Sequence, residues 1–236
     1  MRHHPDALML FAAGFGKRML PLTADRPKPL IEVAGKALID HALAQADAVT
    51  LRRKAVNLHY LPDQIARHLQ HRADLVLLTE TPAILETGGG LRNALPVLGS
   101  GPVFTLNTDA VWQGANPLQV LADHWNPATM DVLLLLAPAA IARGHSGPGD
   151  FALDKAGRIS RAPGEVRTHV YIGAQIICTG LLAEIPQPAF SLNLLWNRMI
   201  ATGRAFGVAF PGHWCDVGRP EGIALAEAML KPAPDV

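Results

Sequence analysis

The stretch at residues 12–23 reads AAGFGKRMLPLT. It overlaps the end of an apolar run at residues 7–13, which predicts a buried strand. A glycine-rich turn directly after the first buried strand is where α/β folds bind phosphates. Gly14 and Gly16 let backbone N–H groups approach oxyanions closely, because glycine has no Cβ. We therefore expect a phosphate-binding loop here, although the loop alone also fits an ordinary strand-to-helix turn.

Two common phosphate motifs do not fit this loop. The dinucleotide fingerprint G-x-G-x-x-G needs a glycine where Met19 stands, and no clear acidic ribose contact follows about twenty residues later. The loop G-x-x-x-x-G-K-[ST] needs a glycine at Phe11 and a hydroxyl at Arg18. Next along the chain, Lys28 stands between two prolines, which stiffen the backbone and hold its ammonium in place. A solvated loop lysine is the alternative.

Composition sets the broad class. The chain has 236 residues, of which 49% are hydrophobic and 17% charged, so it can bury a substantial core. Its net charge of +1 argues against nucleic-acid or membrane partners recruited by bulk charge. Two cysteines, Cys178 and Cys215, exclude a disulfide framework and a cysteine zinc site. No apolar stretch approaches the ~20 residues of a membrane helix, and the short N-terminal run favours a strand over a signal peptide, so we expect a cytoplasmic protein.

Short apolar runs alternate with amphipathic segments, which predicts a Rossmann-like α/β fold with a mostly parallel sheet and helices on both faces. We expect one domain over residues 1–236, with an insertion at about 138–170 that contains a small β-hairpin at 151–160. The strands expected are 7–13, 55–59, 75–79, 103–107, 131–136, 170–178 and 206–210, and the helices expected are 37–47, 62–71, 118–125, 192–201 and 220–230.

Two further segments carry chemistry. Residues 86–90 read ETGGG and predict a second glycine-rich strand-to-helix turn, with a flexible loop as the alternative. Asp109 follows the strand at 103–107, which places a carboxylate at the sheet edge where open α/β sheets bind ligands. An aspartate that caps the next helix is the alternative there.

These motifs together resemble the sugar-1-phosphate nucleotidyltransferases. The family opens with A-A-G-x-G-x-R-[ML]-x-P-L-T followed by K-P-L, and residues 12–23 and 28–30 match both parts. The segments E-T-G-G-G and N-x-D are matched at 86–90 and 107–109. Residues 214–221, WCDVGRPE, resemble the family segment W-x-D-V-G-T-P-E, with Arg219 in place of the usual threonine. The resemblance covers nearly the whole chain and implies the nucleotide-diphospho-sugar transferase fold.

The resemblance implies Mg²⁺-dependent transfer of a nucleotidyl group from a nucleoside triphosphate to a sugar 1-phosphate, with release of pyrophosphate. Asp109 and Asp216 would hold Mg²⁺, a hard cation suited to carboxylate and phosphate oxygens. Arg18 would bind the β- and γ-phosphates, and Lys28 would offset charge near the α-phosphate. The nucleotide would lie against the backbone of residues Ala12, Ala13, Gly14, Gly16, Gly88 and Gly89.

Within the family, the compact length, ETGGG, VNLH at 56–59 and DVGRPE at 216–221 look most like uridylyltransferases that act on N-acetylmuramate 1-phosphate in bacterial cell-wall recycling. Mannose-1-phosphate guanylyltransferases and glucose-1-phosphate thymidylyltransferases share the core and stay open. The sugar would contact residues Glu86, Gly149, Tyr171, Gly173 and Asn193, with Trp196 nearby.

One family feature is missing. Longer members carry an E-K-P element whose lysine holds the sugar phosphate, whereas residues 161–167 read RAPGEVR. Either Arg167 replaces this lysine or the metal holds the phosphate. A non-catalytic nucleotide-sensing module is the alternative from another class, and a Rossmann oxidoreductase is more remote. We expect a monomer or a small homo-oligomer.

Overall fold

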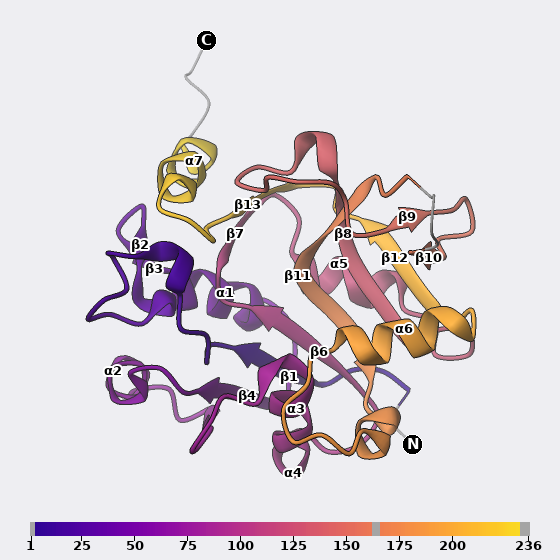
Figure 1. The fold of residues 1–236 in the computed structure, drawn as a ribbon, viewed down its shortest axis with the longest axis horizontal. Helices are drawn as coiled ribbons and strands as arrows, with labels where there is room; N and C mark the ends of the chain where they lie inside the picture. The colour runs from indigo at the N-terminus through magenta and orange to yellow at the C-terminus, as the bar shows by residue number, and fades with distance from the viewer. Residues whose placement is uncertain (1–2, 162–165, 232–236) are drawn as a thin grey trace.

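The computed structural model describes residues 3–161 and 166–231. Its centre is a seven-stranded sheet with the order β12-β8-β11-β6-β1-β4-β5 (Figure 1). Neighbouring strands are parallel except at β11, which runs antiparallel to both β6 and β8. This confirms the predicted mostly parallel α/β sheet. The strands are β1 (Ala7–Phe11), β4 (Arg53–Leu58), β5 (Leu75–Thr79), β6 (Pro102–Asn107), β8 (Val132–Pro138), β11 (His169–Cys178) and β12 (Ala205–Ala209).

Helices cover both faces of the sheet, as predicted. Successive side chains of a strand point to opposite faces, and β1 follows this rule. Leu8 and Leu10 pack in one buried cluster with α1 (Leu38–Asp47), α2 (Pro62–His68) and α5 (Pro117–His124). Ala7 and Met9 pack in a second cluster with α3 (Glu86–Asn93), α4 (Leu95–Leu98) and α6 (Asn193–Ala201). A strand buried on both faces explains why residues 7–13 are apolar without alternation.

A third buried cluster is separate from the two that cover the sheet and contains residues that follow the central strands β1 and β6. It joins the hairpin β2 (Glu32–Val33) and β3 (Lys36–Ala37) to α7 (Glu221–Leu230) (Figure 1). It also contains residues of an antiparallel pair, β7 (Ala110–Gln113) with β13 (His213–Asp216). This pair joins segments about one hundred residues apart in sequence. The sequence analysis did not predict it.

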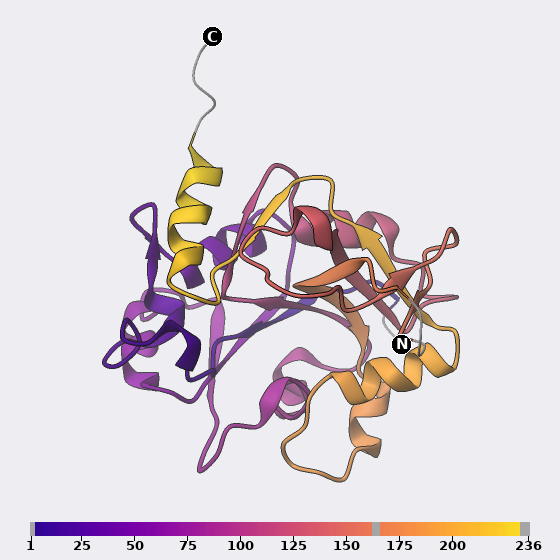
Figure 2. The same cartoon turned by 45° about the horizontal axis from the view of Figure 1, so that its top comes forward.

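The predicted hairpin is confirmed. β9 (Ala152–Leu153) pairs antiparallel with β10 (Ile159–Ser160), and the hairpin lies on the same side of the molecule as α6 and β12 (Figure 2). The segment 161–167, which lacks the family lysine, is described only at its two ends, because residues 162–165 lie outside the described part. Among the helices described, none is long and apolar enough to cross a bilayer.

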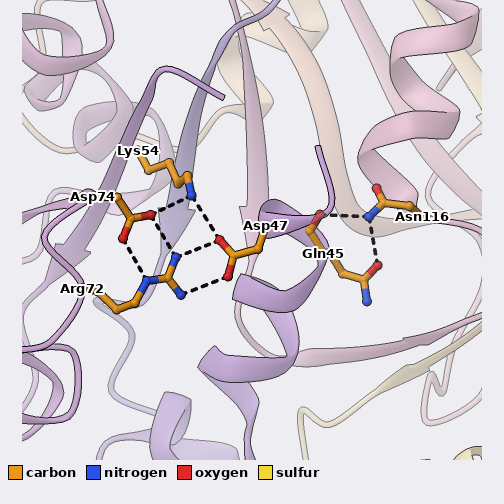
Figure 3. A network of polar contacts seen from close by, with 6 residues as sticks. All are labelled: Gln45, Asp47, Lys54, Arg72, Asp74 and Asn116. Carbon is orange, nitrogen blue, oxygen red and sulfur yellow. Dashed lines mark hydrogen bonds and ion pairs between the residues drawn. The ribbon is translucent and has the colours of Figure 1, made fainter. Parts of the chain in front are cut away.

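A polar network joins α1, β4 and the residues before β5 (Figure 3). Asp47 ends α1, Lys54 lies in β4, and Asp74 directly precedes β5. Lys54 and Arg72 each bond both aspartates, at 2.7–3.1 Å. Beside this network, the Asn116 side chain caps α5 and donates to the Gln45 carbonyl oxygen at 2.8 Å.

Candidate active site

The glycine-rich loop is packed into a fixed shape. Gly16 has φ +63°, a left-handed conformation that favours glycine, and a Cβ there would lie 3.0 Å from both Lys28 Cβ and Thr23 Cγ2. The Thr23 hydroxyl donates to the Gly16 carbonyl oxygen at 2.9 Å. Met19, in the short 3₁₀ helix Lys17–Met19, is fully buried in the third cluster. The loop is therefore anchored on both sides, and residues Gly14, Phe15, Gly16, Lys17 and Arg18 line a cavity, here termed the loop cavity.

A buried chain of hydrogen bonds holds the end of β1. Asn57 Oδ1 accepts from the Ala12 N–H at 2.9 Å, and Asn57 Nδ2 donates to Glu80 Oε1 at 2.7 Å. Glu80 is 1% exposed, and its other oxygen accepts from the Leu85 N–H at 2.7 Å. Ala12 thus lines the site, but its N–H is already bonded to Asn57. This N–H is therefore not free for a phosphate, and the expected contact of Ala12 with the nucleotide stays a prediction.

The β7–β13 pair brings Asp109 and Asp216 together. Asp109 lies between β6 and β7, and its carbonyl oxygen accepts from the Val217 N–H at 2.9 Å. Asp216 is the last residue of β13 and pairs with Ala110. A carboxylate from each of two distant chain segments therefore enters the same site, as the family resemblance implied.

Lys28 forms an ion pair at this site. Its Nζ lies 2.9 Å from Asp109 Oδ2, and its side chain is 12% exposed. Lys28 begins the short 3₁₀ helix Lys28–Leu30, where the flanking prolines restrict the backbone. Lys28 is therefore a fixed, largely buried cation and not a solvated loop lysine.

The pKa values of the two aspartates are shifted in opposite directions. Burial opposes ionisation of Asp109, but the charge and hydrogen bond of Lys28 and the charge of Arg18 outweigh it, so the pKa of Asp109 lies below its ordinary value. Burial and the Asp109 charge raise the pKa of Asp216, and Lys28 and Arg18 offset this only in part. A further cation at the site would relieve the repulsion that remains between the carboxylates.

Gly218 closes the loop cavity opposite Arg18. A Cβ at Gly218 would lie 2.8 Å from Asp216 Oδ2 and 3.2 Å from Arg18 Nη2. Any other residue there would displace the aspartate or the arginine. The glycine at this position thus lets the Asp216 carboxylate and the Arg18 guanidinium lie beside it, where Arg18 and Gly218 line the loop cavity.

A second cavity, the central cavity, adjoins the loop cavity. The two share Gly14, Lys28 and Asp109. Glu86 also lines the central cavity and has φ +62°, a conformation that is uncommon outside glycine and often marks functional sites. The remaining lining residues are Phe11, Ala12, Ala13, Pro29, Asn57, Ile84, Thr87, Asn107 and Thr108.

A third cavity, the distal cavity, shares Phe11, Thr87 and Asn107 with the central cavity. Its other lining residues are Asp150, Arg161, Tyr171, Gln175, Ser191, Leu192, Asn193 and Trp196. One of these residues, the buried Gln175, is held by two hydrogen bonds. It donates to Thr105 Oγ1 at 3.0 Å and accepts from Trp196 Nε1 at 2.9 Å. The Tyr171 ring packs edge-on against Trp196, with centroids 4.9 Å apart. Burial raises the pKa of Tyr171 far above its ordinary value, so its hydroxyl stays protonated.

Four predicted site glycines lie outside these three cavities. Residues 86–90 do not form a turn, because α3 begins at Glu86. The N–H groups of Gly88 and Gly89 donate to the Phe190 carbonyl oxygen at 2.8 and 3.2 Å, and Cβ atoms there would meet the Phe190 ring and the Pro188 carbonyl. The space that a side chain would take at these two glycines is therefore filled by the protein, and the expected contact with the base stays a prediction. They are needed for close packing of α3 against the segment that leads into α6.

The other two glycines shape the distal cavity without lining it. A Cβ at Gly149 would lie 2.5 Å from the Arg167 carbonyl oxygen. Gly173 has φ +85° within the register shift between Tyr171 and Gln175, and a Cβ there would lie 3.0 Å from Asn107 Cβ. Such a bulge redirects neighbouring side chains. Of the residues predicted to contact the sugar, Glu86 lines the central cavity, and Tyr171 and Asn193 line the distal cavity.

The sequence analysis missed the cation of the distal cavity. Arg161 lines it, whereas the exposed Arg167, the expected substitute for the missing lysine, lies outside it. The signal was present, because Arg161 opens the same segment that lacks the lysine. The buried hydrogen bond between Asn57 and Glu80 was also not predicted. A single glutamate after a predicted strand does not indicate which buried residue it will contact.

Comparisons with known proteins agree with this geometry. A profile of the MobA-like NTP transferase domain matches residues 8–149. The chain belongs to this family. This membership confirms that the chain is a nucleotidyltransferase, the class of enzyme that the motifs implied.

Two relatives that match over nearly their full length show a more specific similarity. This transferase is 41% identical to the N-acetylmuramate alpha-1-phosphate uridylyltransferase of Caulobacter vibrioides, over 99% of this chain and 100% of that protein. It is 37% identical to the protein of the same name from Neisseria meningitidis serogroup B, over 94% and 96% of the two chains. Both are sugar-1-phosphate nucleotidyltransferases by name, which confirms the predicted family.

Solved structures share the fold. HddC from Yersinia pseudotuberculosis complexed with GMP-PN superposes with a TM-score of 0.77 at 18% identity, over 95% of this transferase and 99% of that chain. UDP-glucose pyrophosphorylase complexed with UDP-glucose gives a TM-score of 0.74 at 15% identity, over 95% and 97%.

Proposed function

We propose that this transferase converts UTP and N-acetylmuramate 1-phosphate into UDP-N-acetylmuramate and pyrophosphate. The observation that carries the proposal is the meeting of Asp109, Asp216, Lys28 and Arg18 where the loop cavity joins the central cavity. The choice of substrates is supported by the similarity to the two uridylyltransferases over nearly the whole chain.

The three cavities suit the three parts of such a reaction. The loop cavity, lined by Arg18 and the backbone of Gly14 and Gly16, suits the β- and γ-phosphates. The central cavity suits the nucleoside and the α-phosphate beside Lys28. The distal cavity, with aromatic and polar walls, suits the sugar.

In the reaction, an oxygen of the sugar phosphate forms a bond to the α-phosphorus of UTP. The bond from this phosphorus to the bridging oxygen breaks, and pyrophosphate leaves with the electron pair. The nucleophile is already ionised, so no general base is needed. The residues therefore act by alignment and charge neutralisation, with Lys28 at the α-phosphate and Arg18 at the leaving group.

Asp109 and Asp216 are the residues that would hold Mg²⁺. Within residues 3–161 and 166–231, no group of three or more His, Cys, Asp or Glu is arranged around a metal position. Two carboxylates nonetheless fit Mg²⁺, which is often bound by one or two carboxylates together with substrate phosphates. The repulsion that raises the pKa of Asp216 also favours a cation at this place. Bound there, Mg²⁺ would supply charge neutralisation and polarise the phosphoryl oxygens.

A substrate matrix tests the proposal. UTP, GTP, dTTP and ATP are each combined with N-acetylmuramate, mannose and glucose 1-phosphates plus Mg²⁺, and released pyrophosphate is measured. We expect kcat/KM for UTP with N-acetylmuramate 1-phosphate to exceed every other pair by at least about tenfold. Preference for GTP with mannose 1-phosphate, or for dTTP with glucose 1-phosphate, would identify the other branches of the family. Triphosphate binding without pyrophosphate release would favour a sensing module.

Two expectations are not addressed by this assay. The cytoplasmic location and the monomeric or small homo-oligomeric state stay predictions.

A further inference from the structure

Arg161 is the cation of the distal cavity, and its position is fixed. Its Nη1 donates to Asn193 Oδ1 at 2.7 Å. The guanidinium carbon lies 4.2 Å from the centre of the Phe151 ring and 5.6 Å from that of Trp196. Trp196 is itself held by the buried Gln175. These contacts hold the planar guanidinium in place, so little side-chain entropy would be lost when it binds an anion.

Among the residues that the structure describes, the guanidinium has no counter-ion. Within residues 3–161 and 166–231, no carboxylate forms an ion pair with it; Asp150, the acidic residue of this cavity, accepts from the Tyr171 N–H at 2.9 Å. Burial disfavours the charged guanidinium, Asp150 offsets this, and the nearby Arg167 adds further positive charge. A guanidinium has five N–H donors, and among the described residues Asn193 and Asn197 accept from Nη1 alone. Counted against these partners, donors remain for a ligand with acidic oxygens.

Arg161 lines the distal cavity and not the central cavity, which Lys28 and Asp109 line. Phe11, Thr87 and Asn107, which line both cavities, lie at the junction with the central cavity. A sugar whose 1-phosphate reaches Lys28 and Asp109 would then present its ring substituents, and not its phosphate, to Arg161.

We propose that Arg161 binds the lactyl carboxylate that distinguishes N-acetylmuramate from N-acetylglucosamine, and so selects the sugar. This inference rests on the proposed function. The two sugars are otherwise identical, so a site that discriminates between them must recognise the lactyl ether. A carboxylate matches the fork of donors on a guanidinium. Asn193, Phe151 and Trp196 are positioning residues that hold this fork.

The test compares Arg161→Gln, Arg161→Lys and Arg158→Gln with the wild type. Arg158 is the matched control: it is on the same hairpin, but its guanidinium packs over Phe206, away from the distal cavity. Each protein is assayed with UTP and either N-acetylmuramate 1-phosphate or N-acetylglucosamine 1-phosphate, and thermal unfolding checks that each is folded.

We expect Arg161→Gln to lower kcat/KM for N-acetylmuramate 1-phosphate by about 100-fold, mainly through KM, and to leave N-acetylglucosamine 1-phosphate within about threefold. Arg161→Lys should fall between, because lysine keeps the charge but not the fork. Equal losses on both sugars would show that Arg161 holds the shared phosphate or only supports the fold, and would overturn the assignment. Unchanged kinetics would overturn it as well.

A binding measurement separates this inference from the proposed function. If the wild type makes no UDP-sugar from either substrate, the proposed function fails. Calorimetric binding of UDP-N-acetylmuramate and UDP-N-acetylglucosamine then decides the role of Arg161. Tighter binding of the muramate by the wild type, lost in Arg161→Gln, supports the assignment; equal binding of the two sugars by the wild type overturns it.

Discussion

Asp109 and Asp216 are close together in the site, yet they affect folding in opposite directions. Asp109 has a fixed cationic partner in Lys28, so its ionised form is favoured in the folded chain. Asp216 faces burial and a like charge, so its ionised form is disfavoured. Such an unfavourable charge is expected at a site that awaits a cationic ligand, where stability and activity conflict.

Replacement of either aspartate by asparagine should lower turnover by at least about 100-fold, because one charge that neutralises the phosphates through Mg²⁺ is lost. Steady-state pyrophosphate release measures this. Wild-type activity in either variant would remove that residue from the proposed metal site.

The same variants should change stability with opposite signs when unfolded in urea with EDTA at pH 7. Asp216 has a raised pKa in the folded state, so its destabilising effect is complete above that pKa and absent below the unfolded value; Asp216→Asn should therefore stabilise the chain at pH 7 and lose this gain near pH 4. Asp109 has a lowered pKa, so its stabilisation is present at pH 7 and lost as pH falls; Asp109→Asn should cost roughly 1–3 kcal/mol by leaving Lys28 unpaired. Shifts of the same sign in both variants would contradict the electrostatic account.

At the scale of elements, α3 shows where sequence patterns mislead. Three consecutive glycines suggest conformational freedom, and the sequence analysis read them as a turn that receives a base. In the structure they lie in a helix whose close neighbour is the segment 188–190, one hundred residues later in the chain. Local sequence does not reveal that partner. The same reason explains the missed β7–β13 pair, which has strands of only four residues.

Gly89→Ala separates the two interpretations of these glycines. Helix propensity alone would favour alanine by about 1 kcal/mol. A Cβ at Gly89 would instead lie 2.4 Å from the Pro188 carbonyl oxygen, so we expect a net loss of about 1–3 kcal/mol in urea unfolding. Gly180→Ala is the control, because nothing lies within 4 Å of its Cβ position. Unchanged stability with weaker UTP binding would favour the original interpretation of a base-binding turn.

The network of Asp47, Lys54, Arg72 and Asp74 should join α1, β4 and β5 only weakly. Hydrogen bonds from Arg72 and Lys54 hold the pKa of Asp74 well below its ordinary value, so its stabilisation is present at neutral pH and lost as pH falls. The Asp74 side chain is 45% exposed, however, and solvent screens the pairs. Asp74→Asn should therefore cost about 0.5–1 kcal/mol at low salt and less in 1 M salt. Exposed Asp25 provides the control; a loss in Asp74→Asn that salt does not reduce would contradict this account.

At the scale of the whole molecule, the nucleotide site joins parts that fold around different cores. The loop at 12–23 begins at Ala12, which packs in the first cluster, whereas its Met19 packs with Cys215 and Val217 in the third cluster. A bound triphosphate would contact both parts. Ligand binding should therefore stabilise the entire chain, and not a single loop.

UTP with Mg²⁺ at about 100 times its Kd should raise Tm by roughly 5–10 °C, since such binding contributes about 2.7 kcal/mol and a chain of this size gains about 2–4 °C per kcal/mol. Arg18→Gln should lose most of this shift for UTP but keep the smaller shift for UMP, because Arg18 faces the cavity assigned to the β- and γ-phosphates. Differential scanning fluorimetry provides the measurement. Equal reduction for UTP and UMP would place Arg18 elsewhere in the nucleotide site.

Sequence could predict the parts of the molecule that local patterns specify. The apolar strand at 7–13, the loop after it and the hairpin at 151–160 each depend on neighbouring residues, and the structure confirms them. The distal cavity depends on contacts between Arg161, Asn193 and Trp196, which only the folded chain brings together. Motif resemblance supplied the aspartate pair, because no local rule joins Asp109 to Asp216.

The antiparallel strand β11 brings the insert to the same end of the sheet as the loops that follow β1 and β6. Because β11 runs against its neighbours, its first residues lie at the edge where the parallel strands end, and the hairpin insert leads directly into it. On the proposed function, the loops that follow β1 and β6 would serve the nucleotide donor, and β11 with the insert before it would form the wall around the sugar acceptor. The insert can thus change in length or charge without any change in the helices that connect the parallel strands. Preferences for other sugar acceptors can therefore evolve while the nucleotide-binding half stays the same.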